Sequence, residues 1–261
     1  MWGLHMTAVS MLIKESRLSP SELDGGVINL IQWVESIGCY AFDILPALNR
    51  LRKQKIPSIF PHILNPYLIA WRPSACLYPS APAFKLYGGF NAQLCRRTTT
   101  LGESVWRNPV EIDEIIHPLT DQFLLELHNS DSSPISSGVR SAVLLYLAEF
   151  RRTSGISPVV TDVHLQRLCG SMDAVERAAN PAINPDLTLW LLTVGALEAN
   201  PSRNCHYFYS RLSPAFRALG IDSRPLWKQH LQAVAWFDYL FESKLHAIWV
   251  SCQQSRLARP P

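Results

Sequence analysis

The segment from Pro185 to Ala199 most constrains what this chain can fold into, because it is the most apolar stretch of the sequence. Apolar residues occupy nearly every position between Leu187 and Leu197, so they cover all sides of a helix. Such a helix is normally buried on every side. It is too short to span a bilayer, which needs about 20 apolar residues. The segment therefore predicts a central core helix over Asp186–Ala199.

A glycine inside this helix marks a contact. Gly195 costs about 1 kcal/mol relative to alanine in a helix interior. We interpret it as the point where another helix approaches closely.

Two further helices are expected after the central one. The first runs from about Asn204 to Leu219 and ends at Gly220, a common residue type just past a helix C-terminus. Pro214 should kink or split it, because proline lacks the backbone N–H. The second runs from about Pro225 to Ser251. Its apolar residues recur at three- and four-residue steps and share one face: Leu231, Val234, Phe237, Phe241, Leu245 and Ile248. Its polar residues are Lys228, Gln232, Asp238, Glu242 and Lys244.

Six pieces of this region follow one another in a characteristic order: Leu189–Ala196, Phe208–Leu212, Leu219–Ile221, Trp227, Ala235–Asp238 and Leu245–Trp249. Their order and spacing resemble the C-terminal part of the fungal-specific transcription factor domain. That domain is the regulatory region of many Zn(2)-Cys(6) zinc-cluster transcription factors. In the family, six cysteines in a short N-terminal module hold two zinc ions, and a following basic segment contacts DNA. This chain lacks that module.

The resemblance implies an all-α fold, an irregular multi-helix bundle of helix pairs. It implies a regulatory domain of a fungal zinc-cluster-type transcriptional regulator, located in the nucleus and without its own DNA-binding module. The remaining role is regulation through protein partners or self-association, or alternatively the sensing of a small-molecule effector between helices. The resemblance implies neither an enzyme, nor a cofactor, nor a membrane protein.

Charge and cysteine spacing agree with those expectations. A net charge of +3 over 261 residues is nearly neutral and gives no reason to expect a nucleic-acid surface, since such binding needs a concentrated basic patch. The six cysteines are too far apart for a zinc-ligand cluster and indicate small buried side chains in a reducing compartment: Cys39, Cys76, Cys95, Cys169, Cys205 and Cys252. We predict no catalytic, cofactor-binding or metal-binding residue.

The first half of the chain is predicted to be less regular. Residues 1–14 have a helical pattern without a preceding cap, so Met1 is expected to begin inside a helix. Trp2–Met6 resembles a Trp-x-x-His-x segment within the family domain, and this resemblance implies that a domain usually placed upstream is missing. Val27–Arg50 is expected as a broken amphipathic helix, and 56–110 as an irregular Pro-rich insert. We predict a single domain over 1–261. Arg96–Thr100 is either a solvated loop or a phosphorylation or import signal.

The middle of the chain predicts three helices. Apolar residues at helical spacing indicate one over 111–128, followed by a polar linker over Asn129–Ser137. The next two, Val139–Arg152 and about Pro158–Asn180, also resemble the family domain. Ser157 and Pro158 should cap and start the second of these.

Several side chains are open to two interpretations. Glu242 and His246 lie one helical turn apart and form either a hydrogen-bonded pair or part of a metal site. Four tryptophans either pack between helices or line an effector pocket: Trp190, Trp227, Trp236 and Trp249. Ser210 and Lys244 are expected at the surface.

Two other classes of protein remain as alternatives. A helical enzyme with an apolar pocket, such as a terpenoid-type synthase, would need acidic metal-binding clusters, and no Asp-Asp-x-x-Asp motif occurs. A scaffold of stacked helix pairs would show a regular repeat, and none is apparent.

Overall fold

The computed structural model describes residues 34–35, 37–41, 116, 120, 124, 133–155, 159–178, 184–199 and 205–257. These residues are mostly helical and include no β-strand, which confirms the predicted all-α fold. The labelled helices are α6 (Pro134–Thr153), α7 (Asp162–Arg177), α8 (Pro185–Ala199), α9 (Cys205–Ala218), α10 (Arg224–Val234) and α11 (Asp238–Leu257). The predictions for residues 1–33, for the insert at 56–110 and for Arg96–Thr100 lie outside the described residues.

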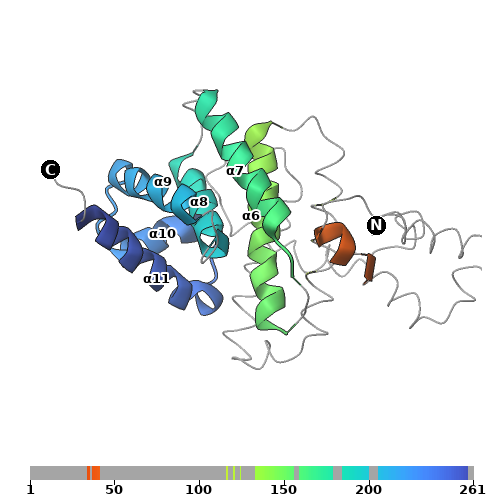
Figure 1. Cartoon of the computed structure of the whole chain (residues 1–261). Coiled ribbons are helices and arrows are strands. Elements are labelled where there is room, and N and C mark those ends of the chain that lie inside the picture. Colours follow the sequence, from red (N-terminus) through yellow and green to blue (C-terminus); the bar gives the residue numbers. More distant parts are fainter. Residues whose placement is uncertain are drawn as a thin grey trace, which may run out of the picture.

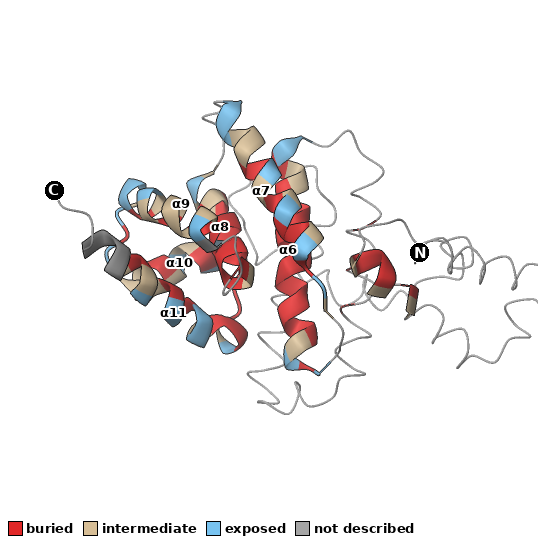
Figure 2. Cartoon of the chain, viewed as in Figure 1, coloured by how far each residue is buried: buried red, intermediate tan, exposed pale blue. Residues whose placement is uncertain are grey.

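Helix α8 is the centre of the described part, as predicted. It contacts α6, α7, α9, α10 and α11, and it lies between the α6–α7 pair and the other three helices (Figure 1). Nearly every residue from Leu187 to Ala199 is buried, and α6 is similarly enclosed (Figure 2). No helix of the described ranges has both the length and the apolar character needed to cross a bilayer.

Two residues determine where α8 begins. The side chain of Asn184 accepts hydrogen bonds from the backbone N–H groups of Asp186 at 2.8 Å and Leu187 at 3.2 Å. Pro185 follows it, at the first helical position, where its missing N–H costs no helical hydrogen bond. The expected start at Asp186 was therefore correct to within one residue.

The contact between α8 and α9 forms at Gly195, as expected. A Cβ at this position would lie within 3.0 Å of three ring atoms of Phe208 on α9. The absence of a side chain thus allows the aromatic ring to pack directly on the α8 backbone.

Pro214 was predicted to kink or split this helix. Helix α9 is continuous through Pro214, so the proline does not split it. Pro214 is exposed, whereas Leu212 and Phe216 on either side of it are buried. This burial holds the last turn in place despite the lost hydrogen bond. The helix then ends as predicted at Gly220, whose φ of 66° suits glycine.

The predicted helix from Pro225 to Ser251 is two helices, α10 and α11, and the prediction of one was wrong. The break spans 235–237, where Ala235 has an extended backbone with φ −172° and ψ 114°. Its carbonyl oxygen accepts a hydrogen bond from Nε1 of Trp190 at 2.6 Å. Trp236 and Phe237 are both buried, so the break turns two large adjacent side chains into the core. A straight helix would have placed them on different faces.

Helix α6 begins before its predicted start at Val139. The assumed linker ends earlier, because Ser133 caps the helix and Pro134 opens it. The Ser133 hydroxyl accepts a hydrogen bond from the backbone N–H of Ser136 at 3.3 Å. A serine followed by a proline is a favourable helix start, so the sequence contained this signal.

Helix α7 begins later than the predicted start at Pro158. Residues 159–161 are not helical, and Asp162 is the first helical residue. Thr161 occupies the N-cap position, but its hydroxyl does not bond to the helix backbone. It binds Glu198 of α8 instead. At the N-cap position, the side chain therefore makes a contact distant in sequence in place of a local cap, and the expected start at Ser157 and Pro158 was wrong.

Parts of the N-terminal half contribute to the core. Cys39 and Tyr40 are buried in a short helical stretch at 37–41. Ile116, Thr120 and Leu124 are helical and buried, as expected for one face of a helix over 111–128. Of the cysteines described as free thiols, Cys39 and Cys252 are buried, as predicted, and Cys169 is half-buried.

Candidate functional site

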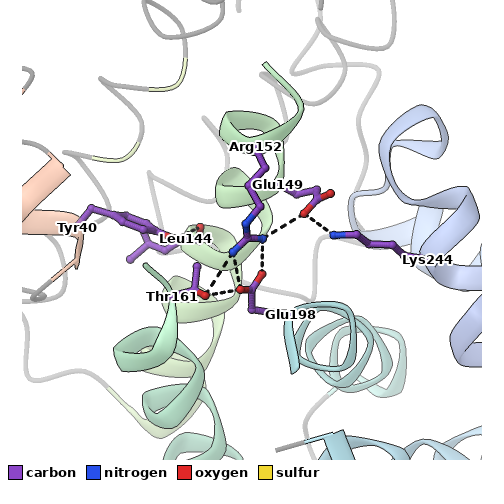
Figure 3. A network of polar contacts seen from close by, with 7 residues as sticks. All are labelled: Tyr40, Leu144, Glu149, Arg152, Thr161, Glu198 and Lys244. Carbon is purple, nitrogen blue, oxygen red and sulfur yellow. Dashed lines mark hydrogen bonds and ion pairs between the residues drawn. The ribbon is translucent and has the colours of Figure 1, made fainter. Parts of the chain in front are cut away.

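Five polar side chains connect four helices, and we call this cluster the polar junction (Figure 3). They are Glu149 and Arg152 of α6, Thr161 before α7, Glu198 of α8 and Lys244 of α11. The junction lies at one end of the central helix, so it connects α8 to three of its neighbours.

Arg152 and Glu198 form its strongest contact. The guanidinium donates two parallel hydrogen bonds to the carboxylate, at 2.7 Å from Nη1 and 2.6 Å from Nη2. Only 11% of the Glu198 side chain is exposed, against 33% for Arg152. A short hydrogen bond from the hydroxyl of Thr161 adds a third donor to the carboxylate. Paired, charge-assisted bonds of this geometry are among the strongest polar contacts in proteins.

Glu149 continues the network towards α11. Its carboxylate accepts a hydrogen bond from Nη1 of Arg152 at 3.2 Å and from Nζ of Lys244 at 2.7 Å. Lys244 was expected to be an ordinary surface residue, and its side chain is 43% exposed. Its ammonium group nevertheless pairs with a carboxylate that is 89% buried, so Lys244 is not a neutral surface position.

The charges in the junction balance, since two basic side chains face two acidic ones. Burial lowers the pKa of Arg152, but its bonds to Glu198 and Glu149 outweigh burial and raise that pKa above the ordinary value. Arg152 therefore keeps its charge, and its carboxylate partners are occupied by hydrogen bonds. The arrangement is suited to holding helices together.

Tyr40 lies beside the junction and connects the N-terminal part of the chain to α6 and α7. Its hydroxyl donates to the carbonyl oxygen of Leu144 at 3.1 Å (Figure 3). Its own carbonyl oxygen accepts a hydrogen bond from Nε2 of His164 at 2.6 Å. Burial raises the pKa of Tyr40 far above its ordinary value, so the phenol stays neutral. The guanidinium of Arg151 lies 5.3 Å from the centre of the Tyr40 ring.

A second polar cluster joins α7 to α9 at the surface. Arg211 pairs with Asp173 at 3.0 Å and with Glu176 at 2.8 Å. Its guanidinium also stacks 3.8 Å from the ring centre of Tyr207. The Tyr207 hydroxyl donates to Asp173 at 2.6 Å. Ser210, expected at the surface, is half-buried on this helix and bonds to the carbonyl oxygen of Tyr207.

Cys169 adjoins this cluster, and its carbonyl oxygen accepts a hydrogen bond from Tyr207. Burial, assisted by the negative charge of Asp173, raises the pKa of the Cys169 thiol to about 11. The thiol is therefore protonated at neutral pH, whereas a nucleophilic cysteine needs a lowered pKa.

The polar residues expected on one long helix instead connect α10 to α11. Lys228 pairs with Asp238 at 2.9 Å and with Glu242 at 3.2 Å, and Arg224 pairs with Glu242 at 3.1 Å. The carboxylate of Glu242 thus faces basic residues of α10, while His246, its suggested partner, is exposed. Within the described ranges, no group of three or more His, Cys, Asp or Glu side chains is placed to hold a metal ion.

The tryptophans occupy the core, which confirms the packing interpretation. Trp190 and Trp227 are fully buried, Trp236 is 4% exposed and Trp249 is half-buried. The indole N–H of Trp227 donates to the hydroxyl of Thr193 at 3.2 Å. Trp249 packs on Trp227, with ring centres 6.0 Å apart.

Sequence reasoning did not identify the polar junction. One signal could have indicated it, because Glu198 is the only charged residue of α8 after Asp186. A lone carboxylate inside so apolar a helix needs a partner. The sequence could not show that this partner is Arg152, which lies 46 positions away.

Comparison with known proteins gives no relative: no family model, curated protein or solved structure matches this chain.

Proposed function

We propose that this chain is a regulatory domain of a fungal zinc-cluster-type transcriptional regulator, acting in the nucleus through protein contacts rather than by binding DNA itself. In this role it is not an enzyme. A small-molecule effector that binds between its helices would be a second means of regulating its activity.

The observation that supports the proposal most is that the segments whose order resembles the family domain contact one another. Gly195, in the first segment, packs against Phe208, in the second. Trp190 donates a hydrogen bond to Ala235, at the start of a later segment.

Two further contacts follow the same pattern. Trp227 bonds to Thr193 of the first segment and packs on Trp249, which ends the last one. The spacing that resembles the family thus consists of positions at which helices meet.

A transcription assay tests the proposal directly. The full chain is fused to a heterologous DNA-binding module in fungal cells, and a reporter gene carrying the binding sites of that module is measured. We expect expression to differ from that obtained with the module alone. A fluorescent fusion of the same chain is expected to accumulate in the nucleus.

Two glycine variants provide matched controls. Gly195→Leu forces a side chain into the Phe208 ring and should abolish the effect on the reporter. Gly170→Ala, at an exposed helical position with no atom within 4 Å of the added Cβ, should preserve it. An intact, nuclear fusion that leaves the reporter unchanged would contradict the proposal.

A further inference from the structure

Two consecutive arginines in the last turn of α6 have opposite environments. Arg152 is surrounded by carboxylates, whereas Arg151 is only 3% exposed and its Nε atom has no hydrogen-bond partner. In the part of the chain that the structure describes, no carboxylate pairs with Arg151.

A second polar group without a partner lies close by. Ser154 is the C-cap residue of α6 and is 7% exposed, and its hydroxyl likewise has no hydrogen-bond partner among the described residues. It follows Arg151 by three positions, a spacing that places two side chains on neighbouring turns of the same helix face. Both groups can donate hydrogen bonds.

A buried charge without a partner is costly, because the protein interior does not replace its hydration. Two features of the fold offset part of this cost. The negative end of the α6 dipole favours a cation in the last turn. The ring of Tyr40, held by Leu144 and His164, presents its face to the guanidinium at 5.3 Å. Neither feature accepts a hydrogen bond from the Nε–H group.

We propose that Arg151 and Ser154 bind an oxyanion, namely a carboxylate or phosphate group of a small molecule. The planar guanidinium suits either group, because both present two oxygens at matching separation. The Ser154 hydroxyl would donate a further bond, and Tyr40 would hold the arginine in place. The Nε atom of Arg151 and the hydroxyl of Ser154 lie within the packing at the end of α6, so neighbouring side chains must move apart when the ligand binds.

If the chain is regulated by a small-molecule effector, this site indicates that the effector carries a carboxylate or a phosphate. The biological role of the site rests on the proposed function, but the binding itself does not. Binding is measured with the purified chain, and regulation is measured with the reporter, so either one can fail without the other.

The test uses sodium phosphate and sodium acetate as probes, with sodium chloride at equal ionic strength and pH as the reference. Calorimetric titration of the purified full chain should show saturable binding of at least one probe. Thermal unfolding should show a midpoint that rises with the concentration of that probe and then levels off, as expected when a ligand binds the folded state. The two probes distinguish a phosphate site from a carboxylate site.

Three variants make the test specific. Arg151→Gln should lose the saturable response, and Ser154→Ala should weaken it several-fold while retaining the fold. Arg217→Gln removes the same charge from an exposed position in the last turn of α9 and should behave as the unmodified chain. Phosphate also stabilises proteins without specific binding, so a higher unfolding midpoint supports the proposal only if the Arg151→Gln protein lacks it. An equal rise of the midpoint in the Arg151→Gln protein, or no saturable binding of either probe to the unmodified chain, would overturn the proposal.

Discussion

The ring of Phe208 occupies the space that a side chain on Gly195 would need. Three of its atoms would lie within 3.0 Å of a Cβ at that position. Phe208 is fully buried, so the ring cannot move outward into solvent. This pair therefore sets how closely α9 approaches the central helix.

Replacing Gly195 by alanine should destabilise the protein. Overpacking of a filled core costs about 1–3 kcal/mol, which exceeds the gain of about 1 kcal/mol that alanine brings to a helix interior. Gly170→Ala is the matched control, since it receives the same gain without a clash and should stabilise by up to about 1 kcal/mol. Urea unfolding of both variants measures the difference, and effects of the same sign would refute the argument.

Truncating Leu192 to alanine should lower the free energy of unfolding by about 2–5 kcal/mol, because it opens a cavity in a packed core. Gln229→Ala, at an exposed position of α10, should change it by no more than about 0.5 kcal/mol. Lys244, although expected at the surface, is unsuitable as a control because it pairs with Glu149. Equal unfolding midpoints for the two variants would mean that α8 is not the core helix.

The contact between Arg152 and Glu198 should show strong energetic coupling. A double-mutant cycle with glutamine at both positions should give about 1–3 kcal/mol, because the carboxylate is largely buried and bonded twice. The same cycle for Arg211 and Glu176, whose carboxylate is 53% exposed, should give about 0.2–1 kcal/mol. If the coupling energy of the first pair is no larger than that of the second, the contact between Arg152 and Glu198 stabilises the fold no more than a surface ion pair does.

Cys169 should react slowly with thiol reagents at neutral pH. Burial first, and then Asp173, raises its pKa from 9.0 to about 11, so the folded protein keeps the thiol proton where an unfolded chain would lose it. The resulting contribution to stability is present below about pH 9 and disappears as the pH rises towards 11. Peptide mapping after iodoacetamide treatment at several pH values measures the rate. Labelling at pH 7.5 as fast as in the urea-unfolded chain would contradict the raised pKa.

The purified chain should not bind duplex DNA sequence-specifically. Its net charge is only +3 over 261 residues, which gives no general reason to expect a nucleic-acid surface. A gel shift at physiological salt with excess competitor DNA is the measurement. A complex that survives the competitor would show that the chain binds DNA directly.

The sequence alone determined features that depend on neighbouring residues. The apolar surface of Asp186–Ala199 was sufficient to predict a buried helix, because a helix without a polar face has no side to leave in water. Gly220 and Gly195 were each predicted for the correct reason, one as a helix end and one as a close contact. The start of α6 was predicted too late although Ser133 and Pro134 were a local signal for it. At the start of α7 and at 235–237, by contrast, a distant residue binds a local group.

Only the tertiary structure decided which polar groups would meet. Thr161 could cap its own helix or bind Glu198, and the choice depends on where α8 lies. The break at Ala235 likewise depends on the indole of Trp190, which lies 45 positions away. Arg151 and Arg152 are identical in type and adjacent in sequence, yet Arg152 pairs with carboxylates and Arg151 pairs with none among the described residues. Helix formation needs only the periodicity of nearby side chains, whereas hydrogen-bond partners are set by the packing of whole helices.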